Sequence, residues 1–197
     1  MELPGVALPM LGYGLAAGES TETEQSAKLL RLAKSGDAAA FEALLRSHEA
    51  QVARTSLRLL GNRQDAQDAA QEVFLRLHRS LRKIDDAGNL SGWLYRVTVN
   101  ACRDILRKRK ATDSLEDWRL SAPGSTEADL GREQQRKLVV EALGALPEKE
   151  RAALTLRDLE GLSTREVAAI LGSSEATVRS QISAARLKIR KILRRRA

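Results

Sequence analysis

The sequence predicts an all-α protein in which an acidic flexible linker joins two small helical domains, the second of them a helix-turn-helix domain. Leu, Ala, Arg and Glu dominate while Gly and Pro are sparse between Gln25 and Lys110, a composition typical of helical chains. Apolar residues recur at helical steps in several segments, which is the period of an amphipathic helix. That periodicity stops between Ala111 and Gly131, so these residues separate two helical blocks.

The composition limits both the kind of core and the kind of partner. Of the 197 residues, 43% are hydrophobic but only 3% are aromatic, so the cores must be mainly aliphatic. The formal net charge of +7 indicates a polyanionic partner rather than any particular fold. The single cysteine, Cys102, excludes an intramolecular disulfide. Because only two histidines accompany it, we expect no metal site, and no motif indicates another cofactor.

The first residues lack the pattern of a targeting or membrane segment. The stretch MELPGVALPMLGYGLAAGES contains prolines and glycines, has no basic region at its start and no uncharged run of membrane-spanning length. We expect residues 1–24 to be a disordered leader, with a docked segment as the alternative. Nothing in this stretch suggests export or membrane insertion, so we expect a cytoplasmic protein.

The first domain is expected at residues 25–110. Asp37 is a suitable N-cap for its first long helix, and Gly61 ends that helix. The segment NRQDAQDAAQEVFLRLHRSL follows and contains the clearest helical pattern of the chain. Its apolar stripe comprises Ala66, Ala69, Ala70, Val73, Phe74, Leu77 and Leu81. The opposite face is polar and carries Asp65, Asp68, Gln71, Glu72 and Arg76.

A break at residues 85–89 precedes the last helix of this domain. We expect Ser91 to be its N-cap and the helix to run from Trp93 to Lys110. Trp93 fits the apolar stripe of this helix, which favours a place in the core over stacking on a nucleic-acid base.

Residues 111–131 are predicted to form the linker. They contain five carboxylates and one arginine, and Pro123-Gly124-Ser125 lies within them.

The second domain is expected at residues 132–197. Its first helix has an apolar stripe of Leu138, Val139, Ala142, Leu143 and Leu146. Pro147 suits the start of the next helix, and Gly161 suits its end.

The segment LSTREVAAILGSSEATVRSQISAARLKIRKIL has the pattern of a helix-turn-helix. Ser163 and Glu166 form a capping box, Gly172 ends a short helix, and Ser174 caps a longer one. The inward positions of the longer helix are Val178, Ile182, Ala185 and Ile189. Its outward positions and its basic C-terminal half suit the major groove and phosphates of DNA. A helical hairpin with a solvated basic face is the alternative when this segment is taken alone.

Three segments in order make the chain resemble an extracytoplasmic-function (ECF) sigma factor of the bacterial sigma-70 family. DAQDAAQEVFLRLHRSL is similar to the family's core-binding helix, and WLYRVTVNACRDILRKRK is similar to its promoter-melting helix. ALPEKERAALTLRDLEGLSTREVAAILGSSEATVRSQISAARLKI resembles the family's second domain nearly throughout. The resemblance covers residues 25–193 and implies two helical domains that act in transcription initiation.

The resemblance also implies a role for particular residues. The residues expected to bind the core RNA polymerase are Asp65, Asp68, Gln71 and Glu72. The residues expected to contact the minus-ten element during strand opening are Arg96, Asn100, Arg103 and Arg107. The residues expected to contact minus-35 promoter DNA are Thr177, Arg179, Ser180, Ser183 and Arg186. Gln181 and Ala184 depart from basic residues that are usual in the family, so promoter preference cannot be copied from relatives.

Two other functions compete with the sigma factor. A stand-alone helix-turn-helix regulator would bind duplex DNA without polymerase, but the core-binding and melting motifs of the first block do not fit it. An enzyme is disfavoured because the sequence has no P-loop, no HExxH and no Ser/His/Asp set. We therefore expect RNA polymerase core and promoter DNA as partners, with no catalytic residues and no small-molecule substrate. The resemblance leaves an anti-sigma partner open, and the acidic linker is either an RNA mimic in the polymerase or a simple spacer.

Overall fold

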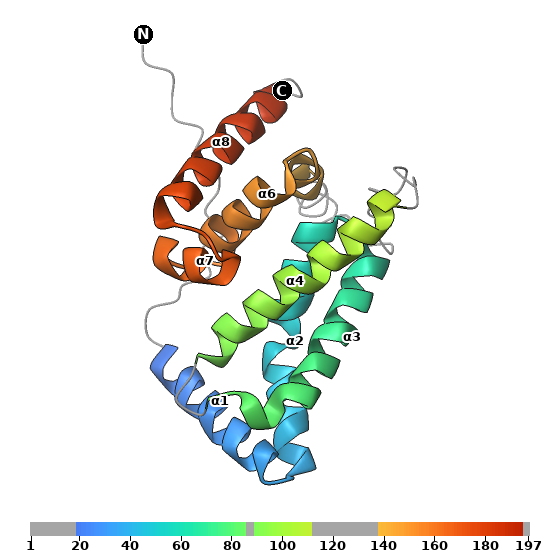
Figure 1. Ribbon diagram of the computed structural model, residues 1–197, viewed down its shortest axis with the longest axis vertical. Helices are drawn as coiled ribbons and strands as arrows, with labels where there is room; N and C mark the ends of the chain where they lie inside the picture. Colours follow the sequence, from blue (N-terminus) through green and yellow to red (C-terminus); the bar gives the residue numbers. More distant parts are fainter. Residues whose placement is uncertain (1–18, 86–88, 112–137, 195–197) are drawn as a thin grey trace, which may run out of the picture.

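The computed structural model describes residues 19–85, 89–111 and 138–194, and these ranges contain helices and turns but no strand. The first lobe contains α1 (Glu19–Lys34), α2 (Ala38–Leu60), α3 (Arg63–Ser80), the short η1 (Leu81–Lys83) and α4 (Leu90–Ala111). The second lobe begins with helical residues 138–144. It continues with α6 (Glu148–Leu154), η2 (Thr155–Leu159), α7 (Thr164–Leu171) and α8 (Glu175–Arg194). The predicted all-α class is confirmed (Figure 1).

Local capping determines where the helices of the first lobe begin and end. The side chain of Asp37 accepts a hydrogen bond from the backbone N–H of Ala40, as the sequence predicts. Gly61 ends α2 in the left-handed conformation at φ 77°, which costs little for a residue without Cβ. Asn62 then caps α3 by accepting a hydrogen bond from Asp65 N at 2.7 Å. The turn at Gly61 and the cap at Asn62 together reverse the direction of the chain, so that α3 packs against α2.

One sequence prediction about a helix start needs correction. For α1 the sequence named no start, and this helix begins at Glu19, within the stretch expected to be a leader. The N-cap of α4 is Asn89 and not Ser91, because the Asn89 side chain accepts the hydrogen bond from Gly92 N at 2.9 Å. Ser91 instead exchanges hydrogen bonds with Gln51 on α2. Both residue types cap helices well, so only the position of α2 decides between them.

The first lobe encloses an aliphatic core between its helices. Leu30 of α1, Leu44 of α2, Val73 of α3 and Leu94 of α4 are almost completely buried in it. Trp93 packs against this core while remaining partly exposed, which supports its predicted place in the core rather than on a base.

The stripe predicted for the first helix of the second lobe is partly wrong. Leu138 and Val139 are 40% and 43% exposed, whereas Val140 is buried. Ala142, Leu143 and Leu146 are buried as expected. A run of adjacent apolar residues does not show by itself which of them faces the core, and the packing of the helix on its neighbours decides it.

The helix that starts after Pro147 does not continue regularly to Gly161. It widens into a π-helical turn, η2, at Thr155–Leu159. The N–H of Glu160 donates to the carbonyl of Thr155, five residues earlier, at 3.0 Å. A single π turn inserts one residue into a helix and is frequent at functional positions. The insertion changes the direction in which Glu160 points.

The helix-turn-helix has the predicted local structure. Ser163 and Glu166 form the complete capping box, with bonds of 2.8 and 3.2 Å. Gly172 ends α7 at φ 63°. Ser174 then accepts a hydrogen bond from Thr177 N, so it caps α8. The inward positions Val178, Ile182 and Ala185 are buried and Ile189 is partly buried, as the sequence predicts.

The two lobes share one apolar core. Leu59 and Leu60 of α2 and Tyr95 and Val99 of α4 lie in the same cluster of buried residues as Leu156 of η2. In Figure 1 the helices α6 and α7 lie beside α4, and α8 covers their other side. The leader up to residue 18 and most of the acidic linker, from residue 112, lie outside the described residues, so their predicted states remain predictions.

Candidate nucleic-acid and protein interfaces

The outer face of α3 contains the four residues expected to bind a protein partner, but the structure divides them into two pairs. Asp68 and Gln71 are exposed. Asp65 forms an ion pair with Arg109 of α4 and also interacts with its cap, Asn62. Glu72 accepts a hydrogen bond from Arg76 at 2.7 Å. Arg76 also reaches Asp104 of α4, with 3.5 Å between the charged atoms. Asp65 therefore joins α3 to α4 directly, whereas Glu72 orients Arg76, which makes the contact with α4.

Leu75 adds an apolar residue to the exposed face of α3 and was missed by sequence analysis. It is 45% exposed and lies one turn after Gln71 and two turns after Asp68. An exposed leucine between polar residues suits a helical partner with an apolar patch. Leu75 falls outside the predicted apolar stripe of this helix, and this position in the sequence already indicates an exposed leucine.

The four residues expected to contact the minus-ten element lie on α4 at helical spacing. Asn100 is exposed, and Arg107 is 81% exposed beside Asp104. Arg96 instead donates a hydrogen bond to the carbonyl of Ala169 in α7 at 3.0 Å. Arg103 forms an ion pair with Glu148 of α6 at 3.2 Å. Half of this predicted DNA-binding face is thus engaged by the second lobe.

A buried carboxylate connects the lobes next to this face. The side chain of Glu160 is only 3% exposed and pairs with Arg58 of α2 at 2.5 Å. It also accepts a hydrogen bond from the hydroxyl of Tyr95 at 3.1 Å. Burial, together with the negative charge of Glu160, raises the pKa of Tyr95 well above its ordinary value, so the phenol remains protonated and donates. None of these three residues was identified from the sequence, because their partners lie far away in the chain.

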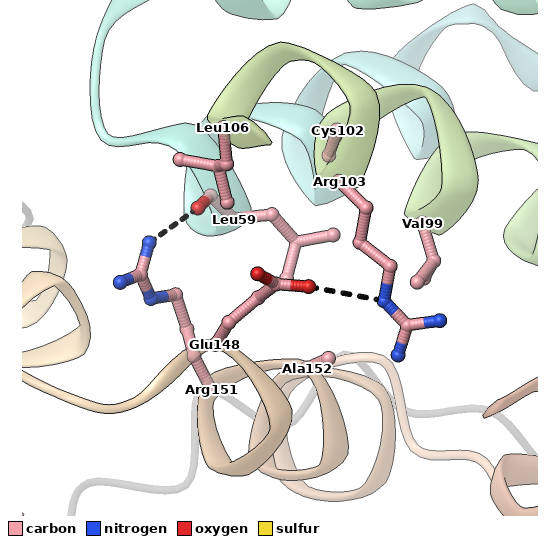
Figure 2. A pocket seen from close by; sticks show the side chains of 8 residues that line it. All are labelled: Leu59, Val99, Cys102, Arg103, Leu106, Glu148, Arg151 and Ala152. Atoms are coloured by element: carbon pink, nitrogen blue, oxygen red, sulfur yellow. Dashed lines mark hydrogen bonds and ion pairs between the residues drawn. The ribbon is translucent and has the colours of Figure 1, made fainter. Parts of the chain in front are cut away.

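Figure 2 shows the small pocket where α2 and α4 of the first lobe meet α6 of the second. Arg151 donates to the carbonyl of Leu59 at 2.6 Å, near the end of α2 where carbonyls lack helical partners. Cys102 lines the same pocket and is 1% exposed. Burial raises the pKa of its thiol to about 12, so it is a protonated and unreactive group in this arrangement.

The predicted minus-35 residues lie on the outer side of α8. Ser180 and Ser183 are exposed. Arg179 is 65% exposed and pairs with Glu175 at 2.7 Å. The hydroxyl of Thr177 lies 2.8 Å from that of Ser174, so Thr177 takes part in the cap. These side chains form an exposed polar surface on the N-terminal half of α8, the half that enters the major groove in helix-turn-helix proteins.

The C-terminal half of α8 is basic, but acidic side chains compensate part of its positive charge. Arg186 forms two hydrogen bonds with the carboxylate of Asp158, at 2.8 and 2.7 Å. These bonds raise the pKa of Arg186 above its already high ordinary value. Lys188 pairs with Glu150 at 2.6 Å. The two acids belong to α6 and η2, so they hold α8 on the lobe as well as reducing its positive charge.

Neither a metal cluster nor a membrane span is present in the part of the chain that the structure describes. In residues 19–85, 89–111 and 138–194 no group of three or more His, Cys, Asp or Glu side chains is arranged to hold a metal ion. No helix in these ranges is long and apolar enough to cross a membrane.

Each lobe matches the model of a known protein family. Residues 44–112 match the family model of Sigma-70 region 2, and residues 136–189 match that of Sigma-70 region 4. The first match contains the exposed faces of α3 and α4, and the second contains the helix-turn-helix. The two lobes are therefore the two regions that the sigma-70 class combines.

Curated relatives narrow this assignment. The chain is 36% identical to the ECF RNA polymerase sigma factor SigM of Mycobacterium tuberculosis, over 94% of this chain and 93% of the relative. It is 32% identical to the ECF RNA polymerase sigma-E factor of Escherichia coli, over 80% and 88% of the two chains. The chain belongs to the ECF sigma factors, the proteins that direct RNA polymerase to promoters.

Solved structures agree with this fold. The structure of CnrH in complex with the cytosolic domain of CnrY matches with a TM-score of 0.67 and 26% identity, over 88% of this chain and 99% of that chain. The sigma factor RpoE, in complex with the anti-sigma factor NepR from Bartonella quintana, matches with a TM-score of 0.65 over 78% and 96%. Its identity of 22% supports the fold alone.

Proposed function

We propose that this chain recruits core RNA polymerase through α3, opens the minus-ten element with α4 and reads the minus-35 element with α8. The observation that carries the proposal is the arrangement of three separate exposed surfaces, on α3, α4 and α8, in one chain. A stand-alone regulator has no use for the first surface. The membership in the ECF sigma factors therefore supports this division of roles over duplex binding alone.

The proposed polymerase-binding surface consists of Asp68, Gln71 and Leu75. A carboxylate and an amide can pair with basic residues of a helical partner, and the leucine supplies apolar contact area. Asp65 and Glu72 are assigned a supporting role, because both are engaged within the first lobe. Asp65 joins α3 to α4 through Arg109, and Glu72 orients Arg76 toward Asp104 of α4, and this alignment presents the surface.

The proposed opening surface is centred on Asn100. An amide can hydrogen-bond the edge of an unpaired base, and neighbouring arginines can hold the phosphates of the displaced strand. Arg107 is highly exposed, whereas Arg96 and Arg103 must give up their contacts with Ala169 and Glu148 of the second lobe to take this role. The chain acts by binding and positioning in this proposal, without a catalytic residue of its own.

Two further expectations accompany the proposal. Because core polymerase is the partner, the chain is expected to work in the cytoplasm. CnrH and RpoE were solved in complexes, with the cytosolic domain of CnrY and with the anti-sigma factor NepR. An anti-sigma partner is accordingly proposed for this chain as well.

The proposal is tested by transcription in vitro with core polymerase on a promoter library. Asp68→Arg reverses one exposed charge of the α3 surface and is expected to abolish promoter-directed transcripts. Glu49→Arg is the matched control, because Glu49 is an exposed carboxylate on α2, outside that surface. Helical content by circular dichroism should be unchanged in both variants. Full activity of Asp68→Arg would refute the assignment of this surface, and strong specific promoter binding by the free protein would favour a stand-alone regulator.

A further inference from the structure

We propose that Glu175 is a specificity-determining residue of α8, and that together with Arg179 it reads both bases of one G·C pair in the minus-35 element. This inference rests on the proposed function of α8. Glu175 is the first residue of this helix and its single acid, whereas the same helix carries six lysines and arginines. A carboxylate repels phosphates, so an acid at the reading end of a basic helix needs a specific explanation.

Glu175 and Arg179 form one hydrogen-bonded unit. The guanidinium of Arg179 donates to Oε2 of Glu175 at 2.7 Å. The two residues are about 6 Å apart along the helix axis, so their side chains converge over one turn. Their side chains are 43% and 65% exposed, which leaves both accessible to DNA. A carboxylate has a second acceptor oxygen and a guanidinium has further N–H donors, so the unit still has donors and acceptors for a base pair.

Stability of the fold does not account for this pair. An exposed ion pair of this spacing contributes little to stability. The start of α8 is already capped by Ser174, whose hydroxyl accepts a hydrogen bond from Thr177 N at 3.1 Å. A negative charge in the first turn is favoured by the helix dipole, but an aspartate would meet that need equally well. The contact with Arg179 is what the longer glutamate provides.

The pair lies where helix-turn-helix proteins read bases. The N-terminal residues of the second helix contact base edges in the major groove, and Glu175 and Arg179 occupy the first two turns of α8. The basic residues from Arg186 onward lie further along the helix and suit phosphates. The single acid of α8 is therefore placed among the residues that choose a sequence rather than among those that hold the backbone.

The chemistry of the pair matches the major-groove edge of G·C. This edge presents two acceptors, N7 and O6 of guanine, beside one donor, the N4 amino group of cytosine. The fork of Arg179 supplies two donors for guanine, and the carboxylate of Glu175 supplies the acceptor beside them. An A·T pair presents an acceptor, a donor and a second acceptor in the same order. It would place a donor opposite the arginine and a carbonyl opposite the carboxylate, so the pair also rejects A·T.

Glu175 is expected to change the balance between specific and non-specific binding. Its hydrogen bond restricts the rotamers of Arg179, which lowers the entropy that this arginine loses when it binds a base. Its negative charge also weakens the attraction of the helix for phosphates of any sequence. Loss of Glu175 should therefore raise the affinity for DNA in general and lower the discrimination between bases. These two changes have opposite signs, and a merely structural residue would not produce them.

The first experiment uses the complete chain with core polymerase on a library randomised in the minus-35 element. The wild-type protein should prefer G·C at one position by about tenfold or more, and Arg179→Ala identifies this position by abolishing the preference. Glu175→Ala should reduce the preference to about twofold and raise the affinity for the other sequences by about two- to fivefold. Urea unfolding of each variant verifies that the fold is retained.

Two further variants separate contact from charge. Glu175→Asp retains the negative charge at the start of α8 but shortens the side chain, so it should lose the preference without the general gain in affinity. Glu42→Ala is the matched control, because Glu42 and Arg46 form an exposed pair of the same spacing on α2 of the first lobe. It should change neither quantity.

Modified bases at the identified position test the contact with cytosine directly. N4-methylcytosine replaces the amino hydrogen that faces the major groove and leaves the pairing hydrogen in place. It should weaken binding of the wild-type protein by about fivefold and leave Glu175→Ala unaffected, as in a double-mutant cycle. Inosine in place of guanine keeps the major-groove edge unchanged and is the control, so it should bind both proteins as guanine does.

A preference for G·C that survives Glu175→Ala would overturn the proposal. Equal weakening of the wild type and Glu175→Ala by N4-methylcytosine would overturn it as well, because the amino group would then have another partner. A uniform rise in affinity with unchanged base preference would show that Glu175 acts by its charge alone, which also contradicts a reading role. A wild-type protein without any minus-35 preference would instead refute the proposed function of α8, and the inference about Glu175 with it.

Discussion

Arg109, near the end of α4, forms an ion pair with Asp65 in the first turn of α3. Asp65 is also hydrogen-bonded to Asn62, the N-cap of its own helix. The side chains of Arg109 and Asp65 are only 25% and 20% exposed, so solvent screens this pair less than a surface pair. An acidic residue expected to face a partner is thus part of the first lobe's own structure.

Asp65→Asn is accordingly predicted to lower stability rather than to remove a polymerase contact. The loss should be about 1–2 kcal/mol, from a partly buried ion pair and a favourable charge at a helix N-terminus. Asp68→Asn should change stability by less than about 0.5 kcal/mol, since Asp68 is exposed. Urea unfolding and binding to core polymerase, measured on both variants, separate the two effects. A stable Asp65→Asn protein that fails to bind polymerase would contradict this assignment.

Asn100→Ala is predicted to impair strand opening more than initial promoter binding. Asn100 is exposed on α4, so its removal should leave the fold intact. Reactivity of unpaired thymines to permanganate should fall on duplex promoters, and a pre-melted bubble should restore transcription in part. Equal defects on both templates would mean that Asn100 acts in another step.

Arg179 and Arg190 are predicted to affect promoter binding differently. They are eleven residues apart on α8, which corresponds to about 16 Å along a helix. Arg179→Ala should flatten base preference at one or two minus-35 positions, at a cost of about 1–3 kcal/mol for a lost contact to guanine. Arg190→Ala should weaken binding to all promoter sequences alike and reduce the salt dependence of binding. A randomised minus-35 library measures both. Identical uniform losses would show that the orientation of α8 is wrong.

Asp158→Asn is predicted to strengthen DNA binding. Asp158 holds Arg186 with two hydrogen bonds, and the neutral amide should release this arginine for a phosphate. The slope of log affinity against log salt should become steeper by about one unit. Glu49→Gln removes a negative charge from the first lobe and controls for net charge. An unchanged slope in Asp158→Asn would place Arg186 away from the DNA.

Glu166 is predicted to contribute to stability only above acidic pH. Hydrogen bonds from Ser163 lower the pKa of Glu166 below its ordinary value. A carboxyl group with a lowered folded pKa stabilises the fold above its unfolded pKa of about 4.3 and loses this contribution as pH falls through the folded value. Glu166→Gln should therefore be less stable than the wild type at pH 7, and the difference should vanish at strongly acidic pH. Thermal melts of both proteins across this pH range test the sign of the stability difference. A stability deficit of Glu166→Gln that grew as the pH fell would contradict the prediction.

The sequence alone determined what depends on neighbours along the chain. The caps at Asp37 and Ser163, the glycine that ends α7 and the inward positions of α8 were all predicted, because they follow from hydrogen bonds and periodicity within a few residues. The residues of α3, α4 and α8 expected to contact partners came instead from the resemblance to the family, and their roles remain predictions. The order of the three family-like segments along the chain indicated the family, which the comparisons confirmed.

The tertiary structure alone decided which of these residues are available to a partner. Whether Asn89 or Ser91 caps α4, whether Leu138 faces the core and whether Asp65 is exposed all depend on helices distant in sequence. The contact between Arg58 and Glu160 joins residues 102 positions apart. No local pattern encodes such a pair, because its energy arises only when folding buries the carboxylate beside the guanidinium.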